Sequence, residues 1–151
     1  MSGTLIQACR QRLQRTPYPA RHLVAAAFIA AVTFASLLPG RVIEQVPIHI
    51  VFFDKLVHFA MYGIMAALLF WSVREPRRRL ERVAAIHLFC SLYGVFMECL
   101  QGFLTSLGRS FSLADMLFNA AGAAVTLAFC TWQSRLHPLV PSTATENSAR
   151  R

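Results

Sequence analysis

Four long apolar runs are the feature of this sequence that most restricts its fold. They cover residues 23–38, 56–73, 83–104 and 111–132. A run of about 20 apolar residues can cross the ~30 Å hydrocarbon core of a bilayer as one helix. Hydrophobic residues make up 56 % of the chain and charged residues only 15 %, too few polar groups to cover a water-facing surface. The sequence therefore predicts an all-α integral membrane protein with four transmembrane helices packed as a small bundle, and excludes a soluble enzyme domain.

The first run is the shortest of the four. Residues 23–38 span only about 24 Å at ~1.5 Å per residue, so His22 and apolar residues beyond Gly40 are expected to extend it. The run follows a basic segment, as the apolar part of a signal peptide does, but no convincing small-residue cleavage site lies near Pro39. The sequence therefore predicts that this helix is retained.

The positions of the basic residues predict the orientation of the bundle. Twelve of the fifteen Lys and Arg residues fall on one side of the membrane under a four-span topology: Arg10, Arg12, Arg15, Arg21, Arg74, Arg77, Arg78, Arg79, Arg82, Arg135, Arg150 and Arg151. Only Arg41, Lys55 and Arg109 fall on the other side. Because basic residues stay on the cytoplasmic side, both termini are predicted to be cytoplasmic. The net charge of +8 then reflects topology and lipid headgroups, and no nucleic-acid partner is expected.

The predicted organisation is a basic cytoplasmic arm over residues 1–21, a membrane domain over 22–133 and a disordered cytoplasmic tail over 134–151. Residues 41–53, between the first two helices, are too apolar for a free polar loop and contain Pro47. The sequence predicts that they lie as an interfacial segment against the outer headgroups.

Polar residues inside the predicted helices are the candidates for function, because a charged group at a helix centre costs about 2.5–3.5 kcal/mol on insertion scales. Helical spacing places them on three faces: Asp54, His58 and Tyr62; Glu98 and Gln101; and Asp115, Asn119 and Gly122. At ~1.5 Å per residue, all three faces reach the outer third of the bilayer. Arg109, in the short loop before the fourth helix, lies above them.

This shared depth predicts that Glu98, Arg109 and Asp115 form one charge-paired cluster. The cluster would face a cavity open to the outer leaflet, lined by His58, Tyr62, Gln101 and Asn119. Ser112 precedes Asp115 by three residues, the spacing of a helix N-cap.

These residues resemble the pattern of the VanZ-like family of small bacterial membrane proteins. The resemblance consists of DKLVHFAMY at residues 54–62, then Glu98, Gln101, Arg109, Ser112, Asp115, Asn119 and Gly122. Thr126 stands where the family often has a second glycine, which leaves the closeness of packing there open. The resemblance implies a four-helix membrane protein, linked in the family's founding member to reduced susceptibility to the glycopeptide teicoplanin.

The leading functional hypothesis is binding or modification of an anionic or lipid-linked envelope ligand at the outer leaflet. Lys55 and Arg109 would hold a phosphate or carboxylate, and Glu98, Asp115 and His58 are the candidate acid/base groups. The other candidate ligand-binding residues are Asp54, Tyr62, Gln101, Ser112 and Asn119. No nucleophile motif is present, and the hypothesis assigns neither a cofactor nor a metal.

Three alternatives remain open from the sequence. The first is a metal site built from His58, Glu98 and Asp115, although Lys55 and Arg109 would repel a cation. The second is a small proton-coupled transporter, for which Ser91 and Thr126 would have to continue the polar path. The third is a non-catalytic membrane partner whose polar helix faces dock other proteins.

Overall fold

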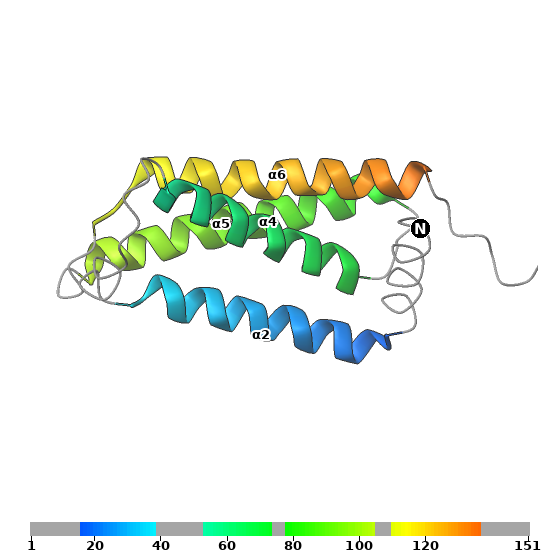
Figure 1. Cartoon of the computed structure of the whole chain (residues 1–151), viewed down its shortest axis with the longest axis horizontal. Coiled ribbons are helices and arrows are strands. Elements are labelled where there is room, and N and C mark those ends of the chain that lie inside the picture. Colours follow the sequence, from blue (N-terminus) through cyan, green and yellow to red (C-terminus); the bar gives the residue numbers. More distant parts are fainter. Residues whose placement is uncertain (1–15, 39–52, 74–77, 105–109, 137–151) are drawn as a thin grey trace, which may run out of the picture.

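The computed structural model describes residues 16–38, 53–73, 78–104 and 110–136, and these residues form four α-helices and no strand (Figure 1). The helices are α2 (Tyr18–Ser36), α4 (Phe53–Ser72), α5 (Arg79–Phe103) and α6 (Leu113–Leu136). Each is long and apolar enough to cross a membrane. The prediction of a four-helix membrane bundle is confirmed. Most of the predicted arm, the outer segment up to residue 52 and the tail from residue 137 lie outside the described residues.

Helix α2 begins at Tyr18, before the apolar run that starts at Leu23 and before His22, which was expected to extend it. Pro17 is the N-cap and a second proline occupies the first turn, where a missing N–H costs nothing. The Nε of Arg21 donates to the Thr16 carbonyl at 2.8 Å, and its guanidinium lies 4.7 Å from the centre of the Tyr18 ring. Because the arginine is held in this way it does not end the helix, and the 19 residues span about 28 Å.

Helix α4 is the centre of the bundle. It packs against each of the other three helices and most extensively against α6, and in Figure 1 it lies between α2 and α6. Buried side chains from all four helices form the core: Val32, Tyr62, Met65, Ala66, Ile86, Cys90, Ala123 and Leu127.

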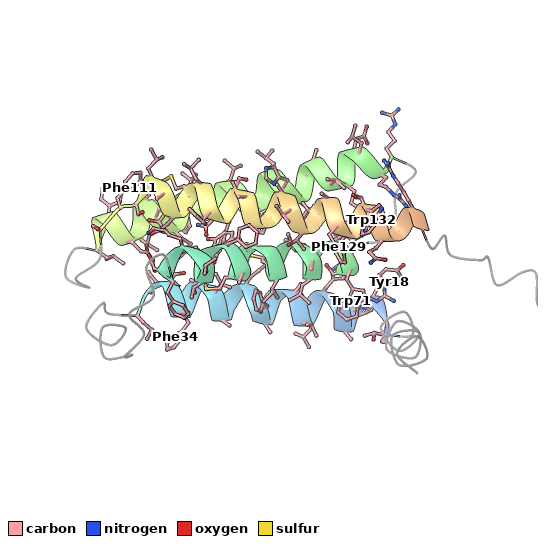
Figure 2. The ribbon with its side chains drawn as sticks, turned by 45° about the horizontal axis from the view of Figure 1, so that its top comes forward. Tyr18, Phe34, Trp71, Phe111, Phe129 and Trp132 are labelled. Atoms are coloured by element: carbon pink, nitrogen blue, oxygen red, sulfur yellow. The ribbon has the colours of Figure 1, made fainter. Side chains whose placement is uncertain are left out.

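The outward faces of the helices are apolar. In the most apolar 18-residue stretch of each helix, only 17 % of the residues of α2 and 28 % of those of each other helix are buried inside the bundle. Leu80 and Phe103 are 81 % and 85 % exposed. Such surfaces need lipid rather than water around them. Figure 2 places Tyr18, Trp71 and Trp132 toward one end of the helices, as expected for an aromatic belt at a membrane interface.

The contact between α4 and α6 depends on two glycines. A Cβ added to Gly122 would collide with the backbone carbonyl of Phe59, and one added to Gly63 would lie 2.8 Å from the Thr126 hydroxyl. The two helices therefore approach closely along this line, as small residues allow in membranes. At Thr126, where the family often has a glycine, the glycine of this contact is Gly63 on α4.

Two arginines bind the backbone at the end of α4. Arg82, buried at 7 % exposure, donates through Nη2 to the Phe70 carbonyl and lies 3.8 Å from the centre of the Phe70 ring. Arg21 donates through Nη1 to the Trp71 carbonyl at 3.4 Å. The last carbonyls of a helix have no partner within it, so these arginines satisfy the helix end and join α2 and α5 to it.

Candidate functional site

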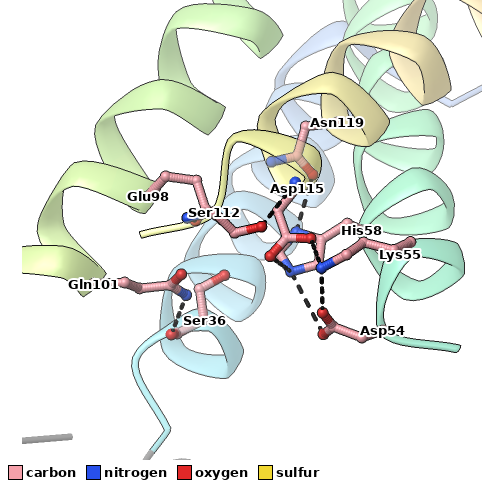
Figure 3. Close-up of polar contacts among 9 residues, drawn as sticks. All are labelled: Ser36, Asp54, Lys55, His58, Glu98, Gln101, Ser112, Asp115 and Asn119. Carbon is pink, nitrogen blue, oxygen red and sulfur yellow. Dashed lines mark hydrogen bonds and ion pairs between the residues drawn. The ribbon is translucent and has the colours of Figure 1, made fainter. Parts of the chain in front are cut away.

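Polar side chains from three helices meet at the end of the bundle where α4 and α6 begin and α5 ends (Figure 3). We call the following residues the polar cluster: Asp54, Lys55, His58, Glu98, Ser112, Asp115 and Asn119. Glu98 and Asn119 are each only 1 % exposed, and Asp115 is 7 % exposed. Buried polar groups in a membrane helix must be satisfied by one another, so the contacts within the cluster decide what it can do.

Lys55 is paired with two carboxylates. Its Nζ forms a direct ion pair with Oδ1 of Asp115 and lies 2.9 Å from Oδ2 of Asp54. The Asp115 side chain is 10 % exposed and that of Lys55 22 %, whereas the Asp54 side chain is 59 % exposed. The pair with Asp115 is thus largely buried and joins α4 to α6, while Asp54 forms the open edge of the cluster.

His58 is held in one orientation by Asn119. The imidazole Nδ1 lies 3.1 Å from Oδ1 of Asn119, and because an amide oxygen only accepts, Nδ1 carries the hydrogen and donates it. The opposite nitrogen, Nε2, lies 3.8 Å from Oδ1 of Asp54 and 3.8 Å from Oδ2 of Asp115. Nε2 therefore faces the carboxylate oxygens that Lys55 does not use.

Glu98 completes the N-terminal cap of α6 from a different helix. Ser112 Oγ accepts the backbone N–H of Asp115 at 3.2 Å, which is the N-cap contact that the sequence predicts. The backbone N–H of Ser112 donates in turn to Oε2 of Glu98 at 3.0 Å. In an ordinary capping box the acidic residue three positions on would accept that N–H. Here Glu98 does so, which leaves the Asp115 carboxylate for Lys55.

Gln101 and Tyr62 lie apart from the ion pairs. Gln101 Nε2 donates to the Ser36 carbonyl at 2.7 Å and so joins α5 to the end of α2. The Tyr62 hydroxyl and the Asn119 Nδ2 are buried and find no hydrogen-bond partner among the described residues. Both side chains lie against Gly94, within 3.1–3.3 Å of where a Cβ would stand.

Arg109 lies outside the described residues, so its predicted pairing with Glu98 and Asp115 stays a prediction. The described contacts of those carboxylates are with Ser112 and Lys55. Sequence reasoning placed Lys55 among the ligand-binding candidates but missed its pairing with Asp115. Lys55 lies in the first turn of α4 and Asp115 in the first turn of α6. This similar depth was the signal in the sequence that could have predicted their pairing.

The structure also contains a cavity of about 390 Å³, at the opposite end of the bundle. It is lined by Leu69, Val73, Glu81, Arg82, Ala85, Ile86 and Phe89. The cavity that the sequence predicts beside the polar cluster stays a prediction.

The family model described as VanZ/LLP1 matches residues 7–134. The match includes every residue of the polar cluster and all but the last two residues of α6. No curated protein and no solved structure matches the chain.

Proposed function

This chain belongs to the VanZ/LLP1 family and is a multi-pass membrane protein, and on that premise we propose that its polar cluster binds an anionic or lipid-linked ligand of the bacterial cell envelope. The observation that carries the proposal is the convergence of buried polar side chains from three helices at one end of the bundle. Two buried donors here, the Tyr62 hydroxyl and Nδ2 of Asn119, have no hydrogen-bond partner among the described residues and could serve a ligand.

The orientation of the bundle is part of the proposal. Arg21 and Arg82 lie at the end of the bundle opposite the polar cluster, and under the four-span topology that the sequence predicts, twelve of the fifteen basic residues fall on that side. By the positive-inside rule, that end faces the cytoplasm of a bacterial inner membrane. The polar cluster then lies in the outer leaflet, where lipid-linked cell-wall precursors are presented. Such a precursor would connect the protein to teicoplanin-type glycopeptide susceptibility.

Lys55 is the residue that would contact an anionic head group. An ammonium group has three N–H donors, and the two carboxylates engage two of them. The third is available to a phosphate or carboxylate oxygen on the open side, where Asp54 is exposed. Exposed apolar side chains beside the cluster, Leu56 at 55 % and Leu113 at 64 %, would contact the lipid part of the same ligand. Within this site His58, Asp115 and Glu98 are the acid/base groups, and Arg109 is a second candidate cation.

The proposal is tested by the melting temperature of the detergent-solubilised protein with added lipid. Phosphatidylglycerol or undecaprenyl phosphate should raise it, whereas phosphatidylcholine should not. The double variant Lys55→Met with Asp115→Asn, which removes both charges of the buried ion pair and takes Lys55 away only from the exposed Asp54, should lose the lipid-dependent rise. An equal rise with phosphatidylcholine, or a full rise in the double variant, would contradict the proposal.

Tyr62→Phe should separate stability from ligand binding. Removing a buried hydroxyl with no described partner should leave the melting temperature unchanged or raise it, since such a group costs about 1–3 kcal/mol. The lipid-dependent rise should shrink if this hydroxyl serves the ligand. Tyr93→Phe is the matched control: the Tyr93 hydroxyl is hydrogen-bonded to Thr33, so this variant should melt lower and keep the full lipid-dependent rise.

The proposed orientation is tested by cysteine labelling in intact cells. Single cysteines at Ser2, Arg78 and Arg109, in a background without the native cysteines, should react with an impermeant reagent from outside only at position 109. Reaction at position 78 from outside, or at position 109 only after the cells are opened, would reverse the orientation.

A further inference from the structure

We propose that Asp54, His58 and Asp115 form a binding site for a divalent transition-metal ion, a site that goes beyond lipid binding. One ligand atom from each residue lies within 4.8 Å of the other two. The set differs from the one considered from the sequence, because Glu98 is committed to the cap of α6 and Asp54 stands in its place. Asp54 and Asp115 come from the first turns of α4 and α6, and His58 lies one turn beyond Asp54.

The spacing of the three donors fits a shared ion better than direct hydrogen bonds. His58 Nε2 lies 3.8 Å from an oxygen of Asp54 and 3.8 Å from an oxygen of Asp115, beyond the reach of a hydrogen bond. Nitrogen and oxygen ligands bind such ions at about 2.0–2.2 Å, so two ligands of one ion lie roughly 3–4 Å apart. The two separations from His58 fall in this range, and because the three atoms all lie within 4.8 Å of one another, the side chains would close around a small ion by a few tenths of an ångström.

Asn119 prepares the imidazole for this role. A histidine that binds a metal through one nitrogen usually donates the hydrogen on the other nitrogen to an oxygen, which fixes the ring and its tautomer. His58 donates from Nδ1 to Oδ1 of Asn119, and Asn119 is 1 % exposed. Nε2 is thereby directed at the two carboxylates, the position from which it would bind a cation that they share.

Lys55 does not occupy the same position as the ion. Its ammonium group pairs with Oδ2 of Asp54 and Oδ1 of Asp115, whereas His58 faces the other oxygen of each carboxylate. An ion held by His58 would therefore contact different carboxylate oxygens from the two that Lys55 contacts.

The chemistry of the donors selects the kind of ion. Imidazole nitrogen suits first-row transition metals, while carboxylate oxygen alone suits Mg²⁺ and Ca²⁺. One imidazole with two carboxylates therefore favours Zn²⁺ or Mn²⁺ over Mg²⁺. Three protein ligands leave positions open for water or for an oxygen of a bound head group.

The test is metal binding to the full-length protein in detergent after treatment with EDTA, with no lipid added. Isothermal titration should show one Zn²⁺ or Mn²⁺ bound per chain and much weaker binding of Mg²⁺. The electron spin echo of bound Mn²⁺ should show coupling to an imidazole nitrogen. Asp54→Asn should weaken binding by about tenfold or more, and His58→Gln should remove the nitrogen coupling.

Glu81→Gln is the matched control, because the Glu81 side chain is 64 % exposed, close to the 59 % of Asp54, and lies at the other end of the bundle. It should bind metal as the natural protein does. Since Asp54 is exposed, Asp54→Asn should fold even if His58→Gln does not. Absence of one-to-one binding, or equal binding by Asp54→Asn and Glu81→Gln, would overturn the proposal. Lipid stabilisation measured in EDTA tests the proposed function separately.

Discussion

Replacing Lys55 with methionine is expected to lower the free energy of unfolding by roughly 3–5 kcal/mol, the usual cost of removing one partner of a buried ion pair. The substitution keeps an apolar chain of similar length in α4 but takes the ammonium group away from Asp115, whose side chain is only 10 % exposed. The carboxylate would then lie in an apolar environment without its ion pair. The expected readouts are a lower yield of folded protein in detergent and a lower melting temperature.

The comparison for Lys55→Met comes from the exposed ion pair between Arg78 and Glu81. Their atoms lie 2.8 Å apart, but the two side chains are 79 % and 64 % exposed, and such pairs contribute about 0–1 kcal/mol. Arg78→Met should therefore change the melting temperature little. Adding Asp115→Asn to Lys55→Met should restore part of the lost stability. Similar losses from Lys55→Met and Arg78→Met would show that the buried pair does not stabilise the bundle.

Gly122→Ala is expected to cost about 3 kcal/mol or more, at the upper end of the usual cost of overpacking. The added methyl group would collide with the backbone carbonyl of Phe59. Because a backbone cannot rotate away as a side chain can, α4 and α6 would have to separate along their whole contact. The loss should appear as a large drop in the yield of folded protein and in its melting temperature.

Gly63→Ala provides the contrast, since the nearest obstacle to its methyl group is the side chain of Thr126 at 2.8 Å. Combining it with Thr126→Ala should recover much of the stability, whereas no side-chain change should rescue Gly122→Ala. Ala124→Leu, at an exposed position of α6, should have an effect within about 0.5 kcal/mol. Full stability of Gly122→Ala would mean that the close contact is not needed.

The number of helices could be predicted because apolar length alone determines it, but the helix ends could not. Apolar length excludes Arg21 from α2, yet the helix begins before it at Tyr18. The arginine is accommodated by the Trp71 carbonyl and by two aromatic rings. Tyr18 is three residues from Arg21, but Trp71 lies fifty residues away, so a local count of apolar residues cannot include it.

The candidate site, too, could be predicted from the sequence only in part. Helical spacing and depth were enough to predict that His58, Asp115 and Asn119 share one end of the bundle, and the hydrogen bond between His58 and Asn119 agrees with that grouping. The choice of partner for each carboxylate could not be predicted. Glu98 binds a backbone N–H and Lys55 binds Asp115, because the rotation of each helix about its axis is set by core packing.

The cap that Glu98 provides to α6 has a consequence for the biogenesis of the protein. During synthesis α5 is complete before Ser112 leaves the ribosome, so the Glu98 carboxylate reaches the translocon without the N–H group that it binds in the finished bundle. A lone carboxylate in a bilayer is costly, and the first turn of α6 is incomplete without an acceptor for that N–H group. We therefore expect α5 and α6 to leave the translocon together, as a helical hairpin, rather than as two independent spans.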